Sequence, residues 1–245
     1  MNNNWNQPPT LFDDSVEWTG EVSVSKFVAN VFSWMVAGLS VTAVVAWYVA
    51  SSGWIENLYN MNTGGMSGLG WVVMLAPLGF ILAMNLGFQR WSSQGIVALF
   101  IAFSGVMGMS LSSIFLVYTG AAITQVFLIT AITFAFMAIV GYTTSTDLTR
   151  FGSLLMMALI GVIVASVVNW FIGSSGLDYI ISIAGVLIFT GLVAYDTQKI
   201  KRIGAGVEYG SESATKLAIL GATSLYLDFV NLFLFLLRLF GGRRD

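Results

Sequence analysis

The stretch Leu217–Phe240, LAILGATSLYLDFVNLFLFLLRLF, decides the class of fold, because it is apolar with few interruptions. A helix of about 20 apolar residues crosses the hydrocarbon core of a bilayer, which is about 30 Å thick. The stretch is longer than this minimum, so it can span a membrane. Its apolar residues are continuous rather than alternating, which favours a helix over a strand of a membrane barrel.

Six further stretches have a similar length and character, and the composition of the whole chain agrees with them. Of the 245 residues, 57% are hydrophobic and 9% are charged, and the mean hydropathy is +0.84. A soluble domain carries about 25% charged residues. The other six stretches are Phe27–Ala50, Leu69–Phe88, Gly95–Tyr118, Ala121–Thr143, Gly152–Ile172 and Leu177–Asp196.

The sequence therefore predicts an all-α integral membrane protein, a bundle of seven transmembrane helices over residues 27–240. A polar, mobile N-terminal tail (1–26) and a short basic C-terminal tail (241–245) flank it. The first segment is acidic and lacks a basic start before an apolar core, so we expect no secretory signal peptide there. Small residues at helical spacing, Gly161 and Ala165, would let helix backbones approach closely, but ordinary packing contacts are the preferred interpretation for them.

The residue types that are missing exclude several kinds of chemistry. The chain has no cysteine and no histidine, which removes disulfides, thiol nucleophiles and the usual zinc and copper sites. We expect no enzyme activity, since no nucleophile–base set is apparent, and no tightly bound cofactor. A retinal pump would need a lysine in the last helix, and the stretch Leu217–Phe240 has none. The net charge of −2 argues against a nucleic-acid partner.

Lysine and arginine set the expected orientation, because they concentrate in cytoplasmic loops. Basic residues occur before the first stretch and in alternate connections thereafter: Lys26, Arg90, Arg150, Lys199, Lys201, Arg202 and Lys216. The N-terminus is therefore predicted to be cytoplasmic. Arg243 and Arg244 disagree, since seven spans place them outside; either the last stretch crosses despite them, or it re-enters and the count is six. Its length favours seven.

Ionisable groups inside the apolar stretches are the candidate functional residues, because each costs at least about 2.5–3.5 kcal/mol at the bilayer centre. Asp228 lies about 18 Å from the cytoplasmic end of the last helix, counted from Lys216. Asp196 is the last residue of the sixth stretch. If that helix continues to Gly204, Asp196 lies about 12 Å from its cytoplasmic end. Arg90 follows the second stretch. Asn231 shares a helical face with Asp228 and is a candidate for lining the same site.

Two carboxylates and an arginine on the same side of the membrane form a workable buried cluster. It can share a proton, or it can attract a hard cation through oxygen ligands when deprotonated. The alternative is structural: Asp228 hydrogen-bonds within the bundle, and Asp196 ends a helix near water. Asp147 and Asp178 lie at helix edges or in loops and are expected to be solvated.

Two segments carry a resemblance to a known family. The pair AYDTQKI (194–200) and SLYLDFVNLF (224–233) resembles the Bax inhibitor-1 (transmembrane Bax inhibitor motif) family, in its bacterial branch. Further similarity lies at 141–148 and 157–161, and the resemblance covers roughly residues 25–244.

The resemblance implies a seven-helix fold with the last helix central, enclosed by the other six. It also implies a pH-sensitive calcium leak in the bacterial inner membrane, governed by a di-aspartyl pair and an arginine on the second helix. By position these are Asp196, Asp228 and Arg90, with calcium as the permeant ion held transiently by the two aspartates. The segment between the aspartates, 197–216, is expected to form a long loop.

A second hypothesis is a regulator that transports nothing and binds a membrane protease or other membrane proteins in a stress response. The resemblance implies this too, because the family is associated with protein quality control. Its partners besides lipid would be proteins, whereas the first hypothesis needs only calcium and protons.

Overall fold

The computed structural model describes residues 14–60 and 65–242, with side chains from residue 23 onward. Seven helical spans within these residues are long and apolar enough to cross a membrane, which confirms the predicted fold class. The third span joins α3 and the short α4. The helices are α1 (Asp14–Ser51), α2 (Gly68–Gly87), α3 (Ser93–Leu111), α4 (Ile114–Val117), α5 (Gly120–Thr143), α6 (Thr149–Ile172), α7 (Ser175–Ala205) and α8 (Glu212–Phe240).

Hydroxyl side chains fix where most of these helices begin. The first backbone N–H groups of a helix have no partner inside it, and a preceding serine or threonine can accept from one of them. Each cap here accepts from the backbone N–H three residues further on. The capping residues are Ser67, Ser92, Thr119, Ser174 and Ser211.

The connection between the first two spans carries the only β-structure in the described residues. A turn of 3-10 helix, η1 (Trp54–Asn57), leads into β1 (Tyr59–Asn60), which pairs antiparallel with β2 (Gly65–Met66). Ser67, at the start of α2, donates its hydroxyl to the Asn57 carbonyl oxygen at 2.6 Å. The connection is therefore a folded cap on one end of the bundle.

Two expectations need correction. α1 begins at Asp14 rather than at Phe27, so residues 14–26 are helical; residues 1–13 lie outside the described part. α7 continues to Ala205, so most of the segment 197–216 is helix and the connection to α8 is 206–211. A Cβ added at Gly161 meets nothing within 4 Å. The close backbone approach considered for Gly161 is therefore not found among the described residues, because α6 is the span least buried in the bundle. Ala165 makes ordinary packing contacts with a buried cluster.

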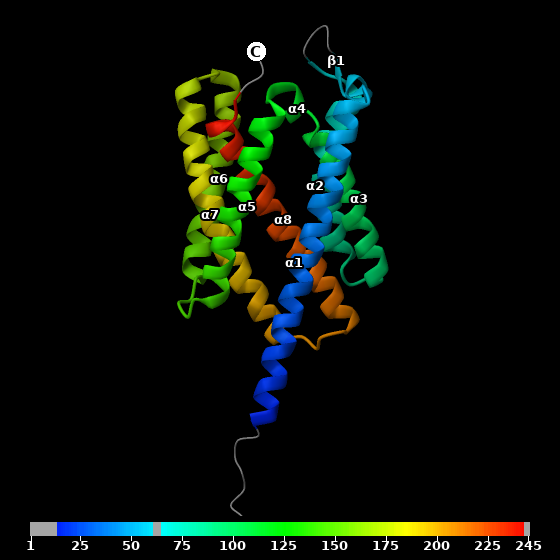
Figure 1. Ribbon diagram of the computed structural model, residues 1–245, viewed down its shortest axis with the longest axis vertical. Helices are drawn as coiled ribbons and strands as arrows, with labels where there is room; N and C mark the ends of the chain where they lie inside the picture. Colours follow the sequence, from blue (N-terminus) through cyan, green and yellow to red (C-terminus); the bar gives the residue numbers. More distant parts are fainter. Residues whose placement is uncertain (1–13, 61–64, 243–245) are drawn as a thin grey trace, which may run out of the picture.

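The last helix has the most buried span. In its most apolar window 61% of the residues are buried, against 11% for α6. α8 packs against α1, α2, α3, α5 and α7, whereas α6 packs mainly on α7. Figure 1 shows α8 crossing obliquely between a group formed by α5, α6 and α7 and another formed by α1, α2 and α3. Enclosure of α8 by all six other spans remains a prediction.

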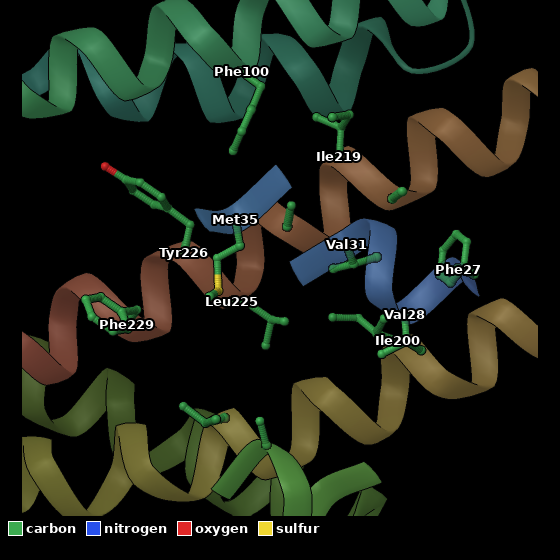
Figure 2. Packing of buried hydrophobic residues seen from close by; sticks show 14 of the residues in the cluster. Phe27, Val28, Val31, Met35, Phe100, Ile200, Ile219, Leu225, Tyr226 and Phe229 are labelled. Atoms are coloured by element: carbon green, nitrogen blue, oxygen red, sulfur yellow. The ribbon is translucent and has the colours of Figure 1, made fainter. Parts of the chain in front are cut away.

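Large side chains fill the space around α8 and hold these groups together. Tyr226 is fully buried, and its ring meets the rings of Phe100 and Phe103 at centroid distances of 6.4 and 5.1 Å. Figure 2 shows Val31 and Met35 of α1 beside Leu225 and Tyr226 of α8. Lipid tails are as apolar as these side chains, so close packing rather than exclusion of water stabilises the contact.

The two ends of the bundle differ in charge. The connections α2–α3, α5–α6 and α7–α8 lie at one end, which we call the basic end because Arg90, Arg150 and the lysines near 199–216 belong to it (Figure 1). At the opposite end, Arg238 of α8 lies 3.8 Å from the Asp178 carboxylate of α7. α8 thus runs unbroken from one end to the other, which favours seven spans over a re-entrant segment. Arg243 and Arg244 lie outside the described residues.

Candidate functional site

Asp228 lies in the middle of α8 and is almost completely enclosed. Its exposed fraction is 5%. One of its carboxyl oxygens, Oδ2, is buried and has no hydrogen-bond partner among the described residues. Leaving a buried polar atom unpaired costs about 1–3 kcal/mol, and more for a charged group. A carboxyl group in this position needs a proton, a cation or both to be stable.

Asp196 on α7 provides the nearest carboxyl group. It is half-buried, and its side chain lies close enough to that of Asp228 for the two carboxyl groups to interact electrostatically. Ionised carboxylates only accept hydrogen bonds, so two carboxyl groups can bond to each other only while one of them carries a proton. The structure thus brings together the two predicted aspartates, although they are far apart in the sequence.

A cavity of about 260 Å³ opens beside this pair, between α2, α7 and α8. Apolar side chains form most of its wall, and the oxygen and nitrogen groups are few. The polar residues that line it are Asn85 of α2, Asp196 and Lys199 of α7, and Thr223 and Ser224 of α8. The cavity lies on the basic-end side of Asp228, since its α8 residues run from Leu217 to Leu227.

Lys199 was counted in the sequence only as a cation that sets orientation, and the structure places it in this cavity. It follows Asp196 by three residues on a continuous helix, which puts both side chains on one face. The Lys199 ammonium interacts electrostatically with Asp196 and Asp228. The signal was present in the sequence as Asp-Thr-Gln-Lys, but it was hidden by the expectation of a loop after Asp196.

Asn85 of α2 also lines the cavity. Its Nδ2 donates to the Ile81 carbonyl oxygen in the same helix, at 2.8 Å. The side-chain carbonyl of Asn85 has no partner among the described residues. That oxygen is therefore available to a ligand, from the one wall of the cavity that neither aspartate supplies.

The other two predicted site residues lie elsewhere. Arg90 is exposed in the turn that follows α2, and within the described residues no ion pair joins it to either aspartate. Asn231 is half-buried, and its amide donates to the Leu227 carbonyl oxygen at 2.8 Å. Asn231 does not line the cavity.

The opposite side of α7 is tied to the α5–α6 connection by a second polar cluster, which we call the loop latch. Gln198 donates to the Thr146 carbonyl oxygen at 2.8 Å and accepts from the Leu148 N–H at 2.9 Å. Arg202 donates to Gln198 and Thr149 at 2.8 Å each, and to Asp147 at 2.5 Å. These hydrogen bonds satisfy both ends of the Gln198 amide.

Asp147, at the edge of the loop latch, is exposed but not free. Hydrogen bonds from Arg202, and secondarily from Thr149, hold the pKa of its carboxyl well below the usual range. Asp147 therefore stays ionised throughout the neutral and mildly acidic range, and it is unsuited to sensing pH there.

A third polar contact joins the α2–α3 connection to the start of α8. The Glu212 carboxylate accepts from the backbone N–H of Ser93 and from Lys216, each at 3.1 Å. Deeper in the bundle, the Tyr226 hydroxyl lies 2.7 Å from that of Thr42, which donates to the Ser104 carbonyl oxygen at 2.8 Å. These groups are satisfied within the protein, and we assign them to packing.

Few oxygen ligands lie near the aspartates. No group of three or more histidine, cysteine, aspartate or glutamate side chains capable of holding a metal occurs in the described residues. Calcium takes six to eight oxygen ligands. Two carboxyl groups, with the neutral oxygens of Asn85 and Ser224 nearby, fall short of that number unless water supplies the rest.

Comparison with known proteins places this geometry in context. The profile of the family described as Inhibitor of apoptosis-promoting Bax1 matches residues 24–245. The chain is 44% identical over 219 residues to a protein of Escherichia coli strain K12 named Inner membrane protein YbhL, covering 89% of this chain and 92% of that one. It is also 41% identical over 236 residues to an uncharacterized protein of Rickettsia prowazekii, covering 96% and 98% respectively.

Proposed function

Because this chain belongs to the Bax inhibitor-1 family and brings two aspartates close together inside its membrane domain, we propose that it is a pH-sensitive cation leak channel. The permeant ion in this proposal is calcium, and the membrane is the bacterial inner membrane with the N-terminus in the cytoplasm. The observation that carries the proposal is the contact between Asp196 and Asp228, with one buried carboxyl oxygen left unpaired. The activity proposed is transport and involves no catalysis.

The proton that joins the two carboxyl groups supplies the pH dependence. While the pair holds one proton it carries a single negative charge, and α7 and α8 stay in contact through the hydrogen bond. When the proton leaves, two like charges face each other in a medium of low dielectric, where their repulsion is far stronger than in water. The pair then favours a divalent cation between the carboxylates, so flux should rise with pH.

The cavity beside Asp196 supplies the entry for the ion. Its α8 residues, Leu217 to Leu227, lie between Asp228 and the basic end, which the positive-inside rule places in the cytoplasm. A partly hydrated cation in it would meet the Asp196 carboxylate and the Asn85 carbonyl before Asp228. Arg90 joins the proposal as a gating residue because it lies in the turn that directly follows α2, and α2 lines the cavity. A shift of α2 against α8 would therefore move the guanidinium.

Flux measurements on reconstituted protein test the proposal. Vesicles containing the purified chain should take up calcium faster at pH 8 than at pH 6, and both Asp196→Asn and Asp228→Asn should remove that difference. Asp178→Asn is the matched control, since Asp178 belongs to the same helix as Asp196 but lies at the opposite end. Arg90→Gln should shift the pH of half-maximal flux.

The result that would overturn the proposal is flux of the two aspartate variants equal to that of wild type at both pH values. Flux no greater than that of empty vesicles would instead favour the regulator hypothesis. In that case a chain lacking residues 1–22 should lose partners that the full chain retains in a pull-down from membranes.

A further inference from the structure

The basic-end segments of α7 and α8 carry four cationic side chains, and three of them have partners. Lys201 donates to the Tyr142 carbonyl oxygen at 2.8 Å and lies 4.8 Å from the centre of the Tyr142 ring. Arg202 is bound in the loop latch. Lys216 forms an ion pair with Glu212 at 3.1 Å. Each of these cations is held by contacts away from the cavity.

Lys199 is the exception. Among the described residues it has neither a hydrogen bond nor an ion pair within 4.0 Å. Of the cationic side chains that the structure describes, it alone lines the cavity beside Asp196. A lysine is a compact point charge on a flexible stem of four carbons. Its ammonium can therefore move between the cavity and the polar boundary of the membrane.

We propose that the Lys199 ammonium is a tethered cation, which competes with the permeant ion for the Asp196–Asp228 pair. The inference rests on the proposed function, because it names what blocks the ion site at rest. Lys199 takes the cation position when its side chain turns inward, and leaves that position to a free cation when it turns outward. The channel thus carries its own competitive blocker, three residues from the first carboxylate that an entering ion meets.

The net charge around the cavity depends on Lys199, and this is why its ammonium can block the cation site. The charged groups involved are Asp196 and Lys199 on α7 and Asp228 on α8, while α2 contributes only the neutral Asn85. With one proton on the pair, Lys199 brings the total charge to zero and nothing remains to attract a cation. With the proton gone the total is −1, so a divalent cation binds strongly only after it displaces the ammonium.

Substitution of Lys199 tests this directly. Lys199→Gln keeps a side chain of similar length without the charge, and Lys199→Arg keeps the charge. We expect Lys199→Gln to lower the calcium concentration for half-maximal flux by about tenfold, the order of magnitude typical of coupling between two sites. Lys199→Arg should stay close to wild type. Lys26→Gln is the matched control, because Lys26 is an exposed lysine on α1 outside the cavity.

A binding measurement separates this inference from the proposed function. Radioactive calcium should bind purified Lys199→Gln in detergent about tenfold more tightly than wild type, whether or not the protein conducts. Equal affinity and equal flux in Lys199→Gln and wild type would overturn the inference while leaving a channel that depends on Asp228 intact. Weaker calcium binding in Lys199→Gln would overturn it as well. Flux that is independent of both aspartates would overturn the proposed function instead.

Discussion

Two polar clusters lie on different sides of the same stretch of α7, and they differ in how completely their hydrogen bonds are made. Gln198 and Arg202 find partners for their polar groups in the α5–α6 connection. Asp196, two residues before Gln198, meets Asp228, whose Oδ2 has no partner among the described residues. One helix thus carries a satisfied cluster and an unsatisfied one within two turns.

This difference in hydrogen bonding distinguishes a cluster with a structural role from one with a functional role. A satisfied cluster fixes the position of a helix, and any change to it costs stability. An unsatisfied carboxyl group in the membrane costs stability as it stands, so its presence points to a task that needs a bound proton or cation. Through the loop latch α7 is anchored on one side, which leaves the contact between α7 and α8 as the place where a change of protonation can act.

The largest effect is expected from Asp228→Asn, which removes the unsatisfied group. Flux should fall at least about tenfold, because the pair loses the charge that attracts a cation. The melting temperature, followed by the fluorescence of the eight tryptophans, should not fall, since the amide can donate to Asp196 and the enclosed position 228 can no longer be charged. A large loss of stability would show that Asp228 has a structural role like that of the loop latch. The two clusters would then not differ in function.

Gly141→Ala should have the next largest effect, on the anchored side of α7. A Cβ at Gly141 would collide with the Ala194 carbonyl oxygen, because α5 and α7 touch there through their backbones. Overpacking of this kind costs about 1–3 kcal/mol. Gly161→Ala is the control and should leave the midpoint of thermal unfolding unchanged, since a Cβ there points into open space. Equal midpoints for the two variants would contradict the close approach.

Gln198→Leu tests the loop latch itself. The change leaves the Thr146 carbonyl and the Leu148 N–H without their partner, which should lower the free energy of unfolding by about 1–2 kcal/mol. The pH at which flux is half-maximal should not move, because the proton-binding pair lies on the other side of the helix. A shift of that pH as large as the one expected for Arg90→Gln would mean that the two clusters act as one.

Asp147→Asn should have the smallest effect. The Asp147 pKa is lowered in the folded protein, so its contribution is complete above the ordinary carboxyl pKa and is lost only as the pH falls toward the lowered value. The difference in melting temperature between wild type and Asp147→Asn should therefore be small and the same at pH 6 and pH 8. A difference in melting temperature that changes between pH 6 and pH 8 would show that the loop latch gains or loses a proton over the same range as the Asp196–Asp228 pair.

Much of the site could be predicted from residue types alone. Asp196 and Asp228 were identifiable because a carboxyl group in an apolar stretch is rare and costly. Lys199 was missed as a site residue because its helix was ended too early: the polar run that follows Asp196 resembles a loop unless its partners are known. Those partners, Thr146, Leu148 and Tyr142, belong to a segment about fifty residues earlier in the chain.

The sequence by itself determined that this protein is a membrane bundle of seven helices with two costly carboxyl groups, because hydropathy and the cost of burying charge are local properties. Only the tertiary structure decided that the two carboxyl groups touch and that Lys199 and Asn85 share their cavity, while Arg90 stays at the exposed turn. Which face of one helix meets which face of another depends on packing between distant segments. The stretch Leu217–Phe240 therefore predicted the class of fold, but it did not predict which residues lie next to Asp228.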